Sequence, residues 1–114
     1  MRVLVCGSRH FHDKKRMKEV LDNYDITTII EGEARGADTL ARLYAERYGI
    51  PCLPFPAQWG KHGKAAGPIR NREMLLSGKP ELVIAFRGPN SRGTQNMINQ
   101  ARKARIPVIV EDVV

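Results

Sequence analysis

The sequence predicts an α/β fold, a three-layer Rossmann-like sandwich with a five-stranded parallel sheet of order 3-2-1-4-5 and four helices. Short apolar runs alternate with segments of helical periodicity along the whole chain. The runs are apolar almost throughout, which is typical of parallel strands covered on both faces. Right-handed crossovers and the usual doubly wound arrangement place the first strand at the centre, beside the fourth.

Five apolar runs are the expected strands. The first three are RVLVC (2–6), ITTII (26–30) and the run that follows Ile-Pro in IPCLPF; the last two are ELVIAF (81–86) and the run after Ile-Pro in IPVIV. Proline disfavours helical geometry in the residue before it, so each Ile-Pro pair marks the end of a helix and the start of a strand.

Four segments carry the helices. Asp13 is a plausible N-cap for the first, of about three turns; Gly49 ends the second, and Pro68 suits the first position of the third, which runs through 69–76. Residues 56–68 lack periodicity and form a long connector, which makes them a candidate functional loop. Apolar residues at helical spacing are Met17, Val20, Leu21 and Tyr24 in the first helix and Ala37, Leu40, Ala41, Tyr44 and Tyr48 in the second.

Length and composition indicate an ordinary globular protein. The 114 residues fit one domain, 1–114, and 42% of them are hydrophobic and 27% charged. The first residues lead straight into an apolar run without a signal peptide, and no run reaches membrane-spanning length. Cys6 and Cys52 lie in apolar runs and are expected to be buried, reduced thiols. We therefore expect a cytoplasmic protein with no membrane partner.

The chain is basic, with a net charge of +7. This charge favours an acidic partner, such as nucleic acid, a phosphorylated small molecule or an anionic surface. A solvated basic surface explains it equally well. The charge alone does not choose between these partners.

Two loops fall at the expected switch point, beyond the carboxyl ends of the first and fourth strands, where such sheets bind ligands. One is Gly7-Ser8-Arg9; the other is RGPNSRGT (87–94). Amides at the start of the last helix, beside the positive end of its dipole, suit a phosphate. The alternative is a plain loop with Ser91 or Thr94 as N-cap. In the second loop the expected ligand-binding residues are Gly88, Ser91, Arg92, Gly93 and Thr94.

The segment EGEARGAD (31–38) is a third loop between a strand and a helix. A carboxylate there, Glu31 or Asp38, is placed to hold ribose hydroxyls, as an acidic residue does in dinucleotide-binding folds. Asp38 in the first turn of a helix is also favourable with the helix dipole and needs no ligand. For Glu33 an exposed position is expected. Gly32 and Gly36 belong to the same candidate ligand-binding loop.

Two further residues are candidates for ligand contact. Arg70, in the first turn of the third main helix, suits bidentate phosphate binding, although helix arginines are usually solvated or paired on the surface. Trp59 is the only tryptophan and lies in the long connector, where it either stacks on a base or pins the connector to the body. His10, His12 and His62 have no metal-like spacing, so no metal and no hydrolase triad are expected.

Four motifs, GSRHFHD, EGEARGAD, PAQWGKHGKAAGPIRNREM and IAFRGPNSRGTQNM, resemble those of the YspA-like branch of the SLOG superfamily. The resemblance runs over nearly the full chain in the family's order. It implies a Rossmann-like fold, a bacterial or phage protein, and the binding of a nucleotide or nucleotide derivative. The superfamily includes the LOG cytokinin-activating phosphoribohydrolases, the DNA-processing protein DprA and sensor domains. Relatives often pair, so a homodimer is plausible.

The LOG enzymes have a phosphate loop of the form PGGxGTxxE, which RGPNSRGTQNM resembles through Gly93 and Thr94. Met97 stands where that pattern has its catalytic glutamate. Arg70 in IRNREM resembles the arginine of the LOG motif ERKxxM and is the one candidate catalytic residue. Methionine neither donates nor accepts a proton, so the resemblance argues against LOG-type cleavage of an N-glycosidic bond.

Three functions are therefore expected in this order. The first is binding or sensing of a phosphate-bearing nucleotide at the switch-point cleft, with no other cofactor. The second is a nucleotide phosphoribohydrolase in which Glu31, Glu33 or Asp38 replaces the missing glutamate. The third is single-stranded nucleic-acid binding, ranked last because aromatic residues make up only 6% of the chain and show no stacking platform.

Overall fold

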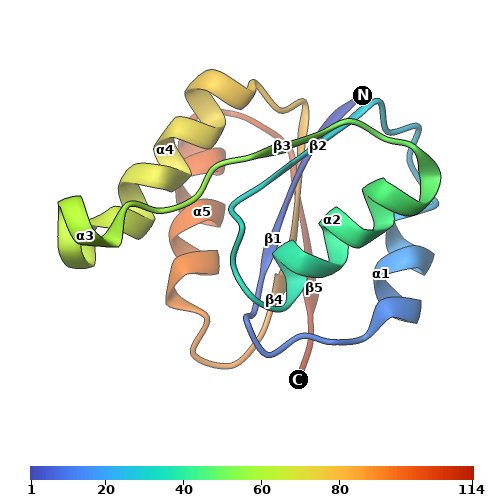
Figure 1. Ribbon diagram of the computed structural model, residues 1–114, viewed down its shortest axis with the longest axis horizontal. Helices are drawn as coiled ribbons and strands as arrows, with labels where there is room; N and C mark the ends of the chain where they lie inside the picture. Colours follow the sequence, from blue (N-terminus) through green and yellow to red (C-terminus); the bar gives the residue numbers. More distant parts are fainter.

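Five parallel strands form one sheet of order β3-β2-β1-β4-β5 in the computed structural model, which describes residues 1–114 (Figure 1). The order and the Rossmann-like arrangement confirm the prediction. In the register, Cys6 of β1 lies opposite Ala85 of β4 at the centre of the sheet. The strands are β1 Arg2–Gly7, β2 Thr28–Glu31, β3 Cys52–Pro54, β4 Leu82–Arg87 and β5 Val108–Asp112.

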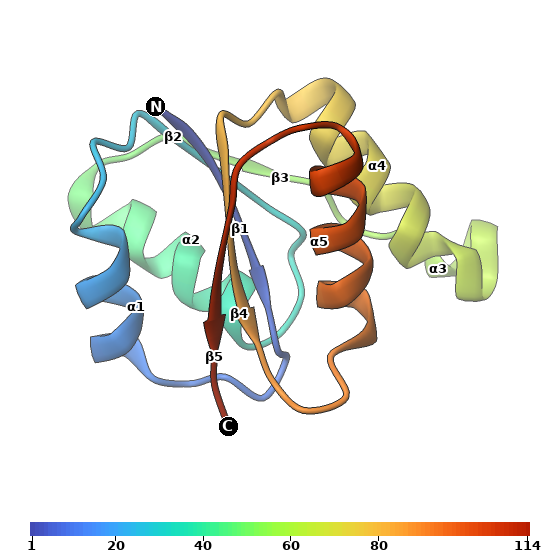
Figure 2. The same ribbon diagram turned by 180° about the vertical axis from the view of Figure 1, so that it is seen from behind.

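Helices cover both faces of the sheet. Figures 1 and 2 show α1 and α2 on one side and α4 and α5 on the other. The short helix α3 projects beyond α4, away from the sheet. The helices are α1 Lys14–Leu21, α2 Ala37–Tyr48, α3 Trp59–His62, α4 Ala66–Gly78 and α5 Arg92–Lys103, and a single 3-10 turn, η1 Gly63–Ala65, joins α3 to α4.

Alternate residues of the strands build two apolar cores. Val3 and Val5 of β1 are fully buried against α1 and α2, whereas Leu4 and Cys6 are buried against α4 and α5. Successive side chains of a strand point to opposite faces, so a strand that is apolar throughout supplies both layers. Burial of both faces fixes the register, and the register fixes which loops meet at the carboxyl edge.

The sequence signals for helix ends are confirmed at two positions. The side chain of Asp13 accepts a hydrogen bond of 3.0 Å from the backbone N–H of Arg16, so it caps α1. Gly49 ends α2 in the left-handed conformation, with φ of +66°. Helix α1 is shorter than expected, because it ends at Leu21 and leaves Tyr24 outside.

The connector at 56–68 differs from the prediction. It contains α3 and η1, and α4 already begins at Ala66, so Pro68 lies inside its first turn. A helix of four residues is too short to show a period, and proline is tolerated in a first turn because the N–H that it lacks would be unpaired there. Cys52 was expected to be buried but is only half-buried, since β3 is a short edge strand. No helix has the length and apolar character needed to cross a membrane.

Candidate functional site

Ser8 joins the loops that follow β1, β2 and β4. Its N–H donates to the carbonyl oxygen of Phe86 in β4 at 2.8 Å, and its own carbonyl oxygen accepts from the N–H of Ala37 at the start of α2 at 3.1 Å. Its hydroxyl accepts from the N–H of His10 at 3.1 Å. The three predicted loops therefore meet at one buried residue.

Glycines allow this close approach. A Cβ atom at Gly7 would lie 2.6 Å from the carbonyl oxygen of Phe86, and one at Gly88 would lie 3.0 Å from the Ser8 hydroxyl. Gly36 has a φ of +74°, and a Cβ there would overlap the carbonyl oxygen of Ser8. Any side chain at Gly7 or Gly36 would push the loops apart.

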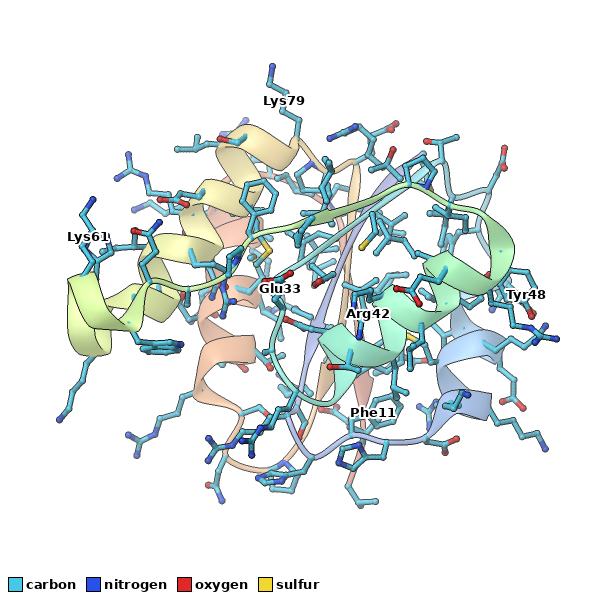
Figure 3. The ribbon with its side chains drawn as sticks, viewed as in Figure 1. Phe11, Glu33, Arg42, Tyr48, Lys61 and Lys79 are labelled. Carbon is cyan, nitrogen blue, oxygen red and sulfur yellow. The ribbon has the colours of Figure 1, made fainter.

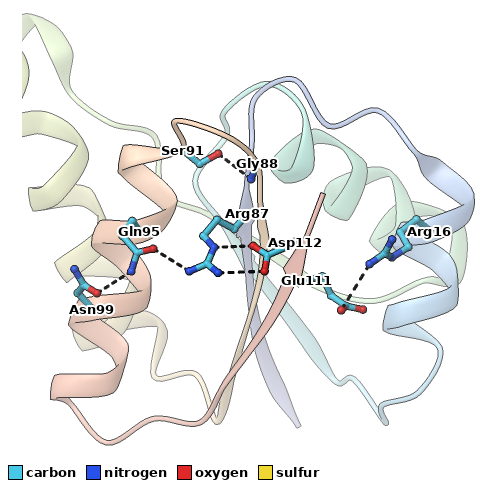
Figure 4. Close-up of polar contacts among 8 residues, drawn as sticks. All are labelled: Arg16, Arg87, Gly88, Ser91, Gln95, Asn99, Glu111 and Asp112. Atoms are coloured by element: carbon cyan, nitrogen blue, oxygen red, sulfur yellow. Dashed lines mark hydrogen bonds and ion pairs between the residues drawn. The ribbon is translucent and has the colours of Figure 1, made fainter. Parts of the chain in front are cut away.

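The first turn of α5 has no side-chain cap. Ser91 occupies the N-cap position, but its hydroxyl accepts a hydrogen bond of 3.0 Å from the N–H of Gly88 behind it (Figure 4). The backbone N–H groups of Gly93 and Thr94 consequently have no acceptor within the chain. Capping by Ser91, the plain alternative considered for this loop, is not what the structure contains. Two free amides at a helix start form a ready anion site.

Gly93 leaves open space for a ligand, and Thr94 has a hydroxyl that is free to contact one. A Cβ at Gly93 would meet nothing within 4 Å, and the residue has an ordinary helical φ, so neither packing nor backbone conformation requires glycine there. Thr94 is only 5% exposed, yet its hydroxyl forms no hydrogen bond and is not sealed from solvent. The free hydroxyl therefore lies beside the free amides and the open space over Gly93.

Arg87 holds the start of α5 against the edge of the sheet. Its guanidinium donates to both carboxylate oxygens of Asp112 in β5, at 2.8 and 3.2 Å, and to the side-chain oxygen of Gln95 in α5 at 3.0 Å (Figure 4). One planar group thus ties the end of β4 to β5 and to the second turn of α5. These hydrogen bonds of Arg87 hold the start of α5, which carries the free amides, at the edge of the sheet.

Arg70 and Asn71 connect the loop after β2 with α5. Arg70 donates at 2.6 Å to the carbonyl oxygen of Gly32 and at 3.1 Å to the side-chain oxygen of Asn71. The amide of Asn71, which is 3% exposed, donates to the carbonyl oxygen of Gly93 at 3.2 Å and to the side chain of Asn96 at 3.1 Å. Arg70 is therefore half-buried at the candidate site, and its hydrogen bonds to Gly32 and Asn71 hold its side chain there.

Asp38 holds the loop after β2 in shape. Its Oδ2 atom accepts from the N–H of Gly32 at 3.0 Å and of Ala34 at 3.2 Å. A Cβ at Gly32 would lie 2.9 Å from this oxygen and would overlap the Arg70 guanidinium, so the two charged groups flank the glycine. Burial raises the pKa of Asp38 to about 6, against the opposing effect of the hydrogen bonds and of Arg70.

Glu31 lies deeper than a ligand-facing residue. Its side chain is fully buried; Oε2 accepts from the N–H of Glu33 at 2.9 Å, and Oε1 has no partner. Burial raises the pKa of this carboxyl to about 7. The expected contact of Glu31 with a ribose does not fit this burial. Glu33 is exposed, as expected, on the loop between β2 and α2 (Figure 3).

The remaining predicted residues lie at the surface or in the core. Arg9 and Arg92 are exposed on the loop after β1 and at the start of α5. Trp59 is 59% exposed, in α3 rather than in a loop, and its indole lies over Gly67 in the first turn of α4. Met97 is fully buried between α5 and the sheet. The position that holds the catalytic glutamate in the LOG motif therefore lies in the hydrophobic core of this chain.

Two surface hollows lie outside the start of α5. One runs between α4 and α5 and is lined by residues that include Ile69, Leu76 and Lys103; the other lies between the end of the loop after β1, at Phe11 and His12, and the C-terminal residues. No three His, Cys, Asp or Glu side chains are grouped in a way that holds a metal ion. The joined loops thus offer amides, a hydroxyl and arginines, which is chemistry for an anion.

Comparisons with known proteins show the family of the chain. The model of the YspA, cpYpsA-related SLOG family matches residues 1–62, more than half of the chain. The chain belongs to this family. A relative in Mycobacterium phage D29, named "Gene 61 protein", is 35% identical over 119 aligned residues, which cover 95% of this chain and 94% of that protein.

The part of this SLOG chain that matches the family model contains two of the three joined loops, those after β1 and β2. The loop before α5 and the contacts of Arg70 lie beyond it. The similarity to the phage protein extends over both. SLOG membership suggests a nucleotide-related function in general terms.

Sequence reasoning missed residues that hold other parts of the candidate site in place. Asn71 stands beside Arg70 in the sequence, but its partners in α5 are more than 20 residues away along the chain, so no local pattern indicates its role. Arg87 begins the predicted loop 87–94, whereas in the structure it ends β4 and pairs with Asp112 of the last strand. The signal for Glu31 was present: it stands two residues after Ile29 in one strand, so it faces the same apolar layer.

Proposed function

We propose that this SLOG protein binds a phosphate-bearing nucleotide, or a ligand derived from one, at the start of α5 and the adjoining loops. The observation that carries the proposal is the uncapped first turn of α5. The Ser91 hydroxyl is engaged with Gly88, and the amides of Gly93 and Thr94 remain free. Backbone amides at a helix start, next to the positive end of its dipole, suit a phosphate group.

Each neighbouring group supports a role in that binding. The Thr94 hydroxyl lies beside the free amides and has no internal partner, so it suits a phosphate oxygen. The exposed Arg92 follows the N-cap and supplies a charge. Gly93 leaves room for close approach. The sugar that follows the phosphate would lie by the loop after β2, next to Arg70 and Asp38. Arg70 holds this loop through its hydrogen bond to the Gly32 carbonyl oxygen. Asp38 has one carboxylate oxygen that the loop amides do not use.

A panel of nucleotides tests the proposal directly. The natural chain is expected to bind at least one nucleoside phosphate saturably in calorimetry, and the Gly93→Ala, Thr94→Val double variant to bind it about tenfold or more weakly, the value of one or two lost phosphate contacts. Because the space over Gly93 is open and the helix tolerates alanine, the variant should keep its fold. Gly60→Ala, at an equally open position in α3, is the matched control.

The absence of heat and of any thermal shift across purine and pyrimidine mono-, di- and triphosphates would overturn the proposal. Equal binding by the double variant and the natural chain would move the site elsewhere on the molecule.

A second candidate function, hydrolysis of a nucleotide's N-glycosidic bond, has one favourable observation. Asp38 is a buried carboxyl whose pKa is raised to about 6, and Arg70 lies on the other side of Gly32. A carboxylate with a pKa near the working pH suits proton transfer, here acceptance of a proton from the water that attacks the anomeric carbon of the sugar; as the glycosidic C–N bond breaks, the departing base takes up a proton. Release of free base from nucleoside monophosphates, abolished by Arg70→Ala and by Asp38→Asn, would support it. No turnover on purine and pyrimidine substrates would exclude it.

A further inference from the structure

Three arginines around the joined loops have no acidic partner. Arg9, Arg35 and Arg92 are exposed, and the four ion pairs of the structure are formed by other residues. They come from three separate segments: the loop after β1, the loop after β2 and the first residue of α5. Other exposed arginines, such as Arg47 and Arg102, also lack an ion pair, but in the joined loops the segments that carry such arginines contact one another. This edge of the sheet therefore carries positive charge that the chain itself does not neutralise.

The backbone holds Arg9 and Arg35 beside each other. Gly36 follows Arg35, and a Cβ atom at Gly36 would lie 2.7 Å from the Cα atom of Arg9. The adjoining Ser8–Ala37 hydrogen bond of 3.1 Å fixes this contact. Both side chains are exposed, so two guanidinium groups on adjacent loops can reach one anion from two sides.

Carboxylates near this pair do not supply that anion. Asp38 is buried and accepts from the amides of Gly32 and Ala34, and Glu31 is sealed in the core. Glu33 is exposed but forms no ion pair. The charge of Arg9 and Arg35 is thus available to a ligand.

The groups at α5 are already sufficient for one phosphate. A phosphomonoester carries about −1.5 to −2 charges at neutral pH, which two free amides, the Thr94 hydroxyl and Arg92 can match. Arg9 and Arg35 remain as a second anion site, adjacent through Ser8, which contacts both Gly88 and Gly36.

We propose that the ligand carries two linked phosphates, one at the start of α5 and one between Arg9 and Arg35. Its chemical class is a nucleoside diphosphate or a nucleotide extended through a pyrophosphate. This inference rests on the proposed nucleotide-binding function and narrows it.

Calorimetry with AMP and ADP, at one pH and one salt concentration, distinguishes binding of two linked phosphates from binding of a single phosphate. ADP is expected to bind the natural chain about tenfold or more tightly than AMP, the effect of one added charge-assisted contact. The Arg9→Gln, Arg35→Gln double variant should lose this preference while its affinity for AMP changes less than about threefold. Arg72→Gln with Lys103→Gln removes the same charge from the hollow between α4 and α5 and should keep the preference.

Equal affinities of the natural chain for AMP and ADP would overturn the diphosphate inference and leave nucleotide binding in place. Loss of the preference in the α4–α5 control as well would also overturn it, because net charge rather than the position of Arg9 and Arg35 would then explain the effect. Tight binding of single-stranded DNA with no response to either nucleotide would remove both proposals.

Discussion

The side-chain amide of Asn71 donates a hydrogen bond of 3.2 Å to the backbone carbonyl oxygen of Gly93, joining α4 to the first turn of α5. The same side chain accepts from Arg70, which in turn donates to Gly32 in the loop after β2. A single buried amide therefore links the free amides of α5 with the opposite wall of the candidate site. Such networks fix geometry when every member is satisfied.

Replacing Asn71 tests this link. Asn71→Ala removes an acceptor from Arg70 and a donor from the Gly93 carbonyl, and we expect a loss of about 1 to 3 kcal/mol in the free energy of unfolding, measured in urea. It should also weaken nucleotide binding, because the start of α5 is no longer held.

Asn99→Ala is the matched control, since Asn99 is exposed on α5 and accepts only from Gln95. We expect it to cost less than about 0.5 kcal/mol. Similar losses of unfolding free energy in the two variants would show that the hydrogen bonds of Asn71 stabilise the chain no more than an exposed side-chain contact does.

Gly36 and Gly49 offer a second comparison. Both have positive φ, +74° and +66°, but a Cβ at Gly36 would overlap the backbone of Ser8, whereas one at Gly49 would meet nothing within 4 Å. We expect Gly49→Ala to cost only the backbone strain, about 1 to 2 kcal/mol, and Gly36→Ala to cost clearly more. Thermal and urea unfolding measure both. If Gly36→Ala were the milder change, the loops after β1 and β2 could not be in contact at this point.

The pH dependence of stability tests the burial of Glu31. Its pKa is raised from the ordinary 4.5 to about 7 in the folded chain, so the folded state binds the proton more tightly than the unfolded state. The stability that this proton provides is fully present below pH 4.5 and is lost as the pH rises through 7.

Glu31→Gln removes this titration while keeping the shape of the side chain. We expect near-equal stabilities of variant and natural chain at pH 4.5, and a variant more stable by about 3 kcal/mol at pH 8. A constant difference between the two proteins across this range would mean that Glu31 is solvated rather than buried.

Sequence reasoning succeeded where a pattern repeats along the chain. The sheet order followed from apolar runs alternating with periodic segments, and the approach of the loops at Gly7, Ser8 and Gly88 followed from the switch-point rule. Helix α3 was missed because four residues show no period. Asn71 and Arg87 were missed because their partners are set by tertiary packing, which no local pattern contains. The engagement of Ser91 with Gly88 was also beyond the sequence, since a serine at that position predicts a cap equally well.

A nuclear magnetic resonance titration with AMP tests the central proposal most directly. In amide spectra of the labelled natural chain, the N–H resonances of Gly93 and Thr94 are expected to shift most, because these two groups have no acceptor in the free chain and would donate to the phosphate. The amides of Gly49 and Gly60, which lie outside the joined loops, should stay in place. Largest shifts in the hollow between α4 and α5, or no shift at Gly93 and Thr94 at saturating AMP, would contradict a phosphate site at the start of α5.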